Sequence, residues 1–357
     1  MDTYPITARS LGRYFKVDGN NLERAYKEHL SGFRDWDQLK HAGDWILLPE
    51  NVGGYMSIDE SMHGKDLYTF LTNKEGHGGP NSLVAVVKGT TAKEVVARFL
   101  AIPEDKRLAV KEVTMDFSNS MFSIVRQAFP NATIVIDCFH IMKLAGEALE
   151  AMRLKLKRLA QKEQKKEERD HRKKLARRAK ARRYYYRKHP KKRGERRGRP
   201  RKLRANERFV PSKLSNGETK VDLLTHVRYP LLKSMDKWTD KQKDRMKLLY
   251  EIEPRMKTAY LLVNKLRNIF KKRQTRDEAR MELHSWYKEV GKSLIRELIA
   301  VRDTIKLKEE YVLNYFINRS TNASAESINS KMKGFRSELR GVADIPFFMF
   351  RLSRIFG

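Results

Sequence analysis

Two aspartates end segments of this sequence that have the pattern of buried β-strands. Asp59 ends the segment 54–59, and Asp116 ends the segment 111–116. If these strands lie side by side in parallel, both carboxylates reach the same edge of the sheet. Carboxylate oxygens suit Mg²⁺ or Mn²⁺, and two such ions can clamp the attacking and leaving oxygens of a phosphoryl displacement. The pair therefore predicts metal-dependent phosphoryl transfer with two ions.

A third carboxylate is expected from a helix packed on this sheet, and Glu326 is the candidate. It lies in a stretch of small polar residues, 320–333, with helical character. Asn322, Asn329 and Lys333 are spaced −4, +3 and +7 residues from Glu326, so a helix places all four side chains on one face. Such a face can bind a metal ion and then a phosphate, whereas the alternative is a solvated helix face with a routine charge pair.

The elements that must position these residues follow a regular order. Five strands are predicted, at 54–59, 67–73, 83–87, 111–116 and 133–137. Helices are predicted at 91–100, at 120–129 and from about 139. The order β-β-β-α-β-α-β-α predicts an α/β ribonuclease-H-like core with a mixed five-stranded sheet, interrupted by a large basic all-helical insertion. In this fold the first and fourth strands are neighbours, which brings Asp59 and Asp116 together.

Four blocks of sequence together resemble the bacterial DDE insertion-sequence transposases, specifically the branch with an Asp-aromatic-His motif that is related to the ISL-type transposases. The blocks are Ser57-Ile58-Asp59-Glu60, Val113-Thr114-Met115-Asp116, Asp137-Cys138-Phe139-His140 and the segment from Asn322 to Lys333. The resemblance covers residues 50–150 and 310–357. It implies a catalytic and metal-binding triad of Asp59, Asp116 and Glu326, with Lys333 as a basic residue seven positions after the glutamate.

Asp137 competes with Asp116 for the second catalytic position, because both residues end a strand. The predicted strand order favours Asp116, since its strand lies beside that of Asp59 and the strand of Asp137 lies one position further out. We expect Asp137 and His140 to be auxiliary residues that orient ligands or contact DNA near the cleavage site. The alternative for His140 is a packed residue at the start of a helix.

The charge of the chain points to a polyanionic partner. The 357 residues carry a net charge of +32, and residues 151–210 alone hold 28 Lys and Arg against six Asp and Glu. The sequence has neither an apolar run long enough to span a membrane nor a signal-peptide pattern at its start. Its one cysteine, Cys138, excludes an internal disulfide and a cysteine-rich zinc module. We expect a cytoplasmic protein of the bacterial nucleoid that binds nucleic acid and not membranes.

Within the basic region, one short stretch has a more specific pattern. Arg197-Gly198-Arg199-Pro200, followed by Arg201 and Lys202, resembles the core of an AT-hook, in which an extended Arg-Pro strand enters the minor groove of A/T-rich DNA. The alternative for most of the basic segment is a tether that binds DNA without regard to sequence.

We expect four regions along the chain. Residues 1–50 form a small helical unit, either a DNA-binding helix-turn-helix or an ordinary helical hairpin. Residues 51–150 form the first part of the core, and residues 311–357 complete it with helices. Between them, residues 151–310 form the basic helical insertion, with a disordered linker near 188–210.

The function predicted from these features is that of a DNA transposase, which cleaves DNA with a metal ion and transfers the freed 3′-OH to a new strand. The partner is double-stranded DNA, at the element ends and at the target, bound by a homodimer or a higher assembly. Only 58 residues precede Asp59, so we also expect a truncated chain or a separate DNA-binding partner protein that recognises the ends. The alternatives are a structure-specific nuclease of the same fold and a non-catalytic DNA-binding protein.

Overall fold

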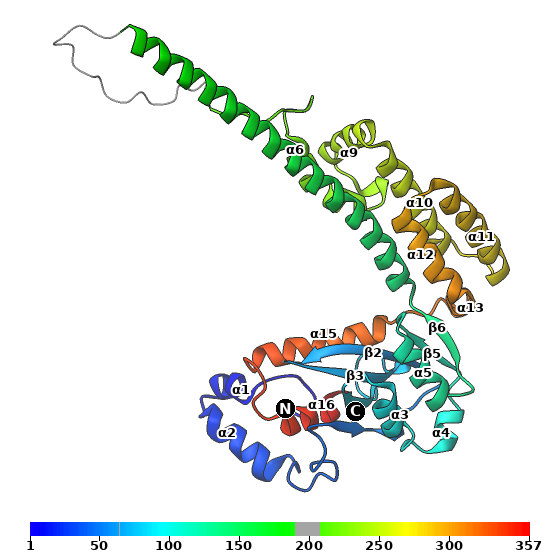
Figure 1. Cartoon of the computed structure of the whole chain (residues 1–357). Helices are drawn as coiled ribbons and strands as arrows, with labels where there is room; N and C mark the ends of the chain where they lie inside the picture. Colours follow the sequence, from blue (N-terminus) through cyan, green and yellow to red (C-terminus); the bar gives the residue numbers. More distant parts are fainter. Residues whose placement is uncertain (64, 190–207) are drawn as a thin grey trace. The chain divides into compact units, whose positions relative to one another are not determined.

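The computed structural model describes residues 1–63, 65–189 and 208–357 (Figure 1). These residues divide into two compact units. The first unit comprises Met1–Ile141, Lys272–Glu282 and Ile305–Gly357, and the second comprises Met142–Lys271 and Leu283–Thr304. Both Asp59 and Asp116 therefore belong to the first unit, together with Glu326. Among the described residues, none of the helices is both long and apolar enough to cross a membrane.

The first unit is built on a single mixed sheet with the strand order β1-β4-β3-β2-β5-β6. Its strands are β1 (Trp45–Leu47), β2 (Tyr55–His63), β3 (Asp66–Asn73), β4 (Leu83–Lys88), β5 (Glu112–Met115) and β6 (Thr133–Ile136). The pairs β1–β4, β4–β3 and β3–β2 are antiparallel, whereas β2–β5 and β5–β6 are parallel. The sheet thus has an antiparallel half and a parallel half that meet at β2.

The prediction of five strands is wrong, because the sheet has six. The additional strand, β1, lies in the region predicted to be helical and pairs with the outer edge of β4. A run of only three residues is too short to show the alternation by which a strand is recognised in sequence. Strand β2 also continues past Asp59 to His63, because its antiparallel pairing with β3 extends that far.

The helices of the first unit include α15 (Ala323–Glu338) and α16 (Ile345–Phe356), which pack on the sheet. Other helices of this unit are α1 (Ala8–Phe15), α2 (Gly19–Ala25), α3 (Ala92–Phe99), α4 (Glu104–Leu108), α5 (Asn119–Ala128), α13 (Glu309–Leu313) and α14 (Tyr315–Asn318). The apolar sides of α15 and α16 pack on β3 and β4 in one buried cluster, which includes Phe70, Val86, Met332, Phe335 and Leu352. This packing fixes α15 over the strand that carries Asp59.

The second unit is helical. It contains α7 (Lys220–His226), α8 (Arg228–Leu232), α9 (Asp240–Ile252) and α10 (Pro254–Lys271). It also contains most residues of three helices that have residues in both units: α6 (Cys138–Lys188), α11 (Arg276–Ser293) and α12 (Arg296–Leu307). The core of this unit includes Trp286, whose indole N–H donates to the Leu262 carbonyl at 2.8 Å. Helix α6 starts two residues after β6, and its residues from Met142 onward belong to the second unit.

Candidate active site

The register of the parallel strands places Asp59 beside Asp116. Ser57 of β2 pairs with Thr114 of β5, each two residues before one of the aspartates, and the charge of Asp116 acts on Asp59. Asp116 follows the last residue of β5, and helix α5 begins three residues later with Ser118 as its cap. The predicted neighbourhood of these two carboxylates is therefore present in the structure.

The two carboxylates interact unfavourably. Burial, followed by the negative charge of Asp116, raises the pKa of Asp59 to about 6. Burial and the charge of Asp116 also raise the pKa of Glu60 above its usual value. Negative charge is thus gathered in a partly desolvated place, where it favours a compensating cation.

His140 supplies one such positive charge. Its Nδ1 lies 2.8 Å from Oδ1 of Asp116 and 3.8 Å from Oδ2 of Asp137. Interaction with Asp116, and then with Asp137, raises the pKa of His140 to about 9, although burial opposes this. This raised pKa favours the protonated ring at neutral pH, with Nδ1 facing both aspartates.

Asp137 is almost fully buried and lies at the junction of β6 and α6. Its Oδ1 accepts a hydrogen bond from the Phe139 backbone N–H at 3.1 Å, which caps the first turn of α6. Its own backbone N–H donates to the Met115 carbonyl at 3.0 Å. These contacts hold the Asp137 carboxylate on the same side of the His140 ring as Asp116, since both aspartates face Nδ1.

Helix α15 contributes two asparagines to the carboxylate pair. The Asn329 Nδ2 donates to Oδ2 of Asp59 at 2.6 Å, and the Asn322 Nδ2 donates to Oδ1 of Asp116 at 3.4 Å. The oxygen of Asn322 accepts from the Ser57 hydroxyl, which lies on the same side of β2 as Asp59. Asn322 and Asn329 are both buried, so α15 is joined to the sheet at the site by polar contacts.

Glu326 is one turn of α15 away from each asparagine, but its side chain is exposed. Among the residues that the structure describes, no three His, Cys, Asp or Glu side chains are grouped so that they could hold a metal ion. The structure thus brings Asp59 and Asp116 together and does not group Glu326 with them. Lys333, two turns further along α15, is also exposed.

A second polar cluster, which the sequence analysis did not identify, lies next to the site on β5. The Lys74 Nζ is 3.1 Å from Oε1 of the buried Glu112, and Asn318 donates to Oε2 of Glu112 at 3.0 Å. Burial opposes the charge of Glu112, but hydrogen bonds from Ser320 and Asn318 and the charge of Lys74 outweigh it and lower its pKa. The cluster ties β5 to the segment that leads into α15. No spacing rule links these residues in the sequence, whereas Ser57 could have been found from its i, i+2 relation to Asp59.

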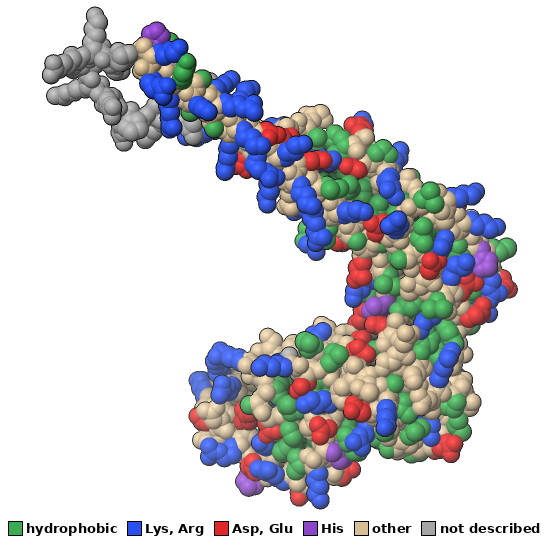
Figure 2. All heavy atoms as spheres, viewed as in Figure 1, with side chains coloured by type: hydrophobic (Ala, Val, Ile, Leu, Met, Phe, Trp, Pro, Cys, Tyr) green, Lys and Arg blue, Asp and Glu red, His purple; other side chains and the backbone are tan. Residues whose placement is uncertain are grey.

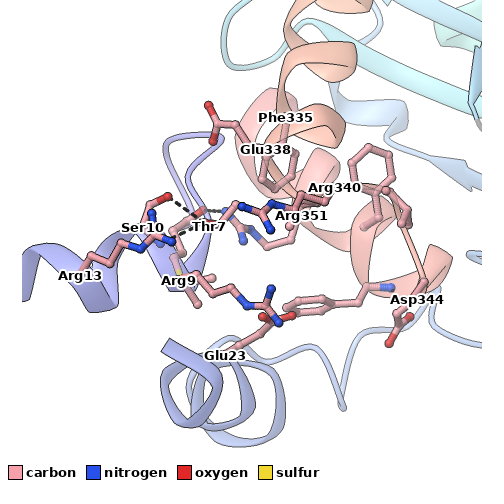
Figure 3. Close-up of a pocket in the computed structure, with 18 residues that line it drawn as sticks. Thr7, Arg9, Ser10, Arg13, Glu23, Phe335, Glu338, Arg340, Asp344 and Arg351 are labelled. Atoms are coloured by element: carbon pink, nitrogen blue, oxygen red, sulfur yellow. Dashed lines mark hydrogen bonds between the residues drawn. The ribbon is translucent and has the colours of Figure 1, made fainter. Parts of the chain in front are cut away.

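A pocket of about 370 Å³ lies elsewhere in the first unit, between α1 and the segment that joins α15 to α16 (Figure 3). Its lining includes Arg9, Arg13, Glu338 and the buried Arg351. One guanidinium nitrogen of Arg351, Nη2, donates to the backbone carbonyls of Met1, Tyr4 and Ile6. The pocket contains none of the predicted site residues, and Arg351 serves there to hold the N-terminal segment on α16.

The predicted DNA-binding residues Arg197, Gly198, Arg199, Pro200, Arg201 and Lys202 lie outside the described residues.

Comparison with known families agrees with the resemblance noted in the sequence. The model of a transposase family, the DDE transposases of the ISL3 type, matches residues 56–352, a range that includes Asp59, Asp116 and Glu326. Comparison with curated proteins and with solved structures found no match. The family match covers most of the chain. The chain belongs to the ISL3-type DDE transposases.

Proposed function

We propose that this transposase cuts DNA at the ends of its element and joins the freed 3′ ends to a new duplex, with Asp59 and Asp116 as metal ligands. The observation that carries the proposal is that β2, which holds Asp59, pairs in parallel with β5, directly after which Asp116 lies. The interaction of the two carboxylates supports it, because the charge of Asp116 contributes to the raised pKa of Asp59. Family membership supports the general class of reaction.

We further propose that the sheet is a ribonuclease-H-like core with β1 added at its edge. The order β4-β3-β2-β5-β6 supports this, since three antiparallel strands are followed by two parallel ones. In such a core the first and fourth strands along the chain are adjacent at the centre of the sheet. Without the added β1, these strands are β2, which holds Asp59, and β5, which Asp116 follows.

The residues at the site fit Mg²⁺ or Mn²⁺. Two adjacent carboxylates offer hard oxygen ligands, and a cation there would offset the repulsion between them. Within the described part of the chain, the side-chain oxygen of Asn329 is buried without a hydrogen-bond partner, so it too is available to a cation or its ligands. Asp59 and Asp116 would hold two ions, with Glu326 as the third carboxylate. Bound ions of this kind supply activation of the attacking oxygen and neutralisation of charge on the phosphate.

The reaction has two steps of the same kind. Water attacks the phosphorus at the element end, a new O–P bond forms, and the bond to the 3′ oxygen breaks to leave a 3′-OH and a 5′-phosphate. The freed 3′-OH then attacks a phosphorus of the target DNA and displaces the 3′ oxygen of the target strand.

The protein's own residues orient and balance the charges of this site. The imidazolium of His140 places a positive charge beside the carboxylates of Asp116 and Asp137, both of which face its Nδ1. Asn329 and Asn322 fix the orientation of the two aspartates. Lys333, on α15, would contact a phosphate of the bound DNA. Because two element ends must be held together, we propose that at least two copies of the chain act on DNA, with or without a separate end-binding protein.

A strand-transfer assay tests this function. The purified chain is incubated with Mn²⁺, a supercoiled target plasmid and a labelled duplex that carries the end of its own element with a free 3′-OH. A transposase joins the label covalently to the plasmid. A nuclease of the same fold would cut DNA without joining it, and a non-catalytic DNA-binding protein would do neither, so either result would overturn the proposal.

A further inference from the structure

Residues 171–188, at the end of α6, form a strongly cationic stretch of helix. Ten Lys and Arg residues lie between His171 and Lys188, and this stretch contains no Asp or Glu. The last buried side chain of α6 is that of Ala160, and every residue from 176 to 189 is exposed. Figure 2 shows Lys and Arg side chains gathered along this end of the helix. Its larger apolar side chains are the half-buried Leu175 and the exposed Tyr184, Tyr185 and Tyr186, which the ten cations outnumber.

The cations of this stretch are distributed around the whole helix. Successive residues of an α-helix are about 100° apart, so Arg177, Arg178 and Lys180 already point in different directions, and Arg182 and Arg183 add others. Several of these cations, such as Arg178 and Arg182, are four residues apart and repel each other. A flat anionic surface would neutralise only one side of such a helix. A partner with negative charge on both sides of the helix fits it better.

The major groove of duplex DNA has this arrangement. It is about 12 Å wide, close to the diameter of an α-helix with its side chains, and it is bordered by a phosphate backbone on each side. An 18-residue helix is about 27 Å long and spans about eight base pairs. Over that length the duplex carries roughly 16 phosphates. This number exceeds that of the ten cations, of which Arg172 and Lys173 also lie near Glu168 and Asp170.

We propose that residues 171–188 of α6 bind in the major groove of double-stranded DNA. The exposed hydroxyl groups of Tyr184, Tyr185 and Tyr186 are further hydrogen-bond donors to phosphates on different sides of the helix. This surface is separate from Arg197–Lys202, for which a minor-groove contact is predicted. The inference rests on the proposed function only in taking DNA as the partner, because binding by this helix does not need the carboxylate site.

The test compares two variants that each lose four positive charges. In the first, Arg177, Arg178, Arg182 and Arg183 are replaced by Gln, which retains helix propensity. The matched control replaces four exposed lysines of the second unit by Gln: Lys237, Lys241, Lys247 and Lys257. These lysines lie among acidic residues such as Asp240 and Asp244. Circular dichroism and thermal unfolding verify that both variants are folded.

Affinity for a 20-base-pair duplex is measured over a range of salt concentrations in EDTA, so that no cleavage occurs. Each lost phosphate contact lowers the magnitude of the slope of log K against log salt by about 0.9, so this magnitude should be smaller by about 3 to 4 in the α6 variant. At 0.1 M salt the α6 variant should bind at least about tenfold more weakly than the wild type. The control should keep the slope of the wild type. Equal losses in the two variants, or an equal loss of affinity for a single strand of the same sequence, would overturn the proposal.

Dimethyl sulfate footprinting on the same duplex identifies the groove, because it methylates guanine N7 in the major groove and adenine N3 in the minor groove. The wild-type chain should protect guanine N7, and the α6 variant should lose that protection. If the α6 variant loses only adenine protection, or if the wild type protects no guanine, the major-groove placement is wrong. These outcomes are independent of catalysis: a chain that binds in this way but never joins DNA would refute the proposed function and leave this inference intact.

Discussion

At the scale of single residues, the site is defined by two carboxylates, Asp59 and Asp116, whose negative charges repel each other in a partly buried place. Asp59 receives a hydrogen bond from Asn329, and Asp116 is paired with the His140 imidazolium. These partners offset part of the cost of placing two negative charges together, yet the pKa of Asp59 stays raised at about 6. The remaining excess of negative charge is the physical basis for expecting cations at this site.

The raised pKa of Asp59 predicts that its charge destabilises the metal-free fold. The folded-state pKa of about 6 exceeds the usual 3.8, so stability is lost as pH rises from about 4 through 6. Asp59→Asn removes this charge and should raise the free energy of unfolding at pH 7 by about 1 to 3 kcal/mol, with little effect at pH 4. Urea denaturation in EDTA at both pH values measures this. A variant less stable than the wild type at pH 7 would contradict the account.

The raised pKa of His140 predicts that the free energy of unfolding decreases at alkaline pH. Its folded-state pKa of about 9 exceeds the usual 6.5, so its pairing with Asp116 stabilises the fold fully below about pH 6.5 and is lost as pH rises through 9. The wild type should lose about 1 to 3 kcal/mol of unfolding free energy over this range that His140→Gln does not lose. Proton NMR of the imidazole gives the pKa directly, and Asp116→Asn should return it towards 6.5. A titration near 6.5 in the wild type would contradict the proposed ion pair.

At the scale of elements, α15 packs on the sheet and contacts β2 and the end of β5 through polar side chains. Asn322 is buried and joins Ser57 of β2 to Asp116 beyond β5. Asn322→Ala would leave both partners without this contact, and we expect a loss of about 1 to 3 kcal/mol of unfolding free energy. Ser330→Ala, at an exposed position of the same helix, should change stability by less than about 0.5 kcal/mol. Chemical denaturation measures the stability of both variants. Equal stability of Asn322→Ala and Ser330→Ala would contradict a stabilising contact of Asn322 with Ser57 and Asp116.

Part of this arrangement could be predicted from the sequence, because it follows from periodicity. The apolar run of β4 and the strand patterns that lead to Asp59 and Asp116 predicted the sheet and its two central acids, although β2 continues past Asp59 to His63. Helical spacing correctly placed Asn322 and Asn329 on one face of α15. The short edge strand β1 and the pairing of Lys74 with Glu112 could not be predicted, since both depend on contacts between distant segments. The exposed position of Glu326 likewise depends on how α15 packs, which spacing alone does not determine.

At the scale of the whole molecule, the charges divide between two tasks. Residues 151–210 carry a net charge of +22, whereas the remaining 297 residues carry +10. The carboxylate pair lies in the first unit and the cationic end of α6 in the second. Affinity for DNA and cleavage of DNA are therefore expected to respond to different substitutions. Cleavage should depend on Asp116 as the second metal ligand and much less on Asp137.

The central claim is tested most directly by cleavage of a supercoiled plasmid that carries the element's ends, with Mg²⁺ or Mn²⁺. Asp116→Asn should lose at least about 100-fold in the rate of nicking, because it removes a carboxylate ligand. Asp137→Asn should lose no more than about 10-fold, since asparagine can still cap α6 and Asp137 acts through His140. The account would be contradicted if Asp137→Asn were inert while Asp116→Asn cleaved the plasmid at the wild-type rate.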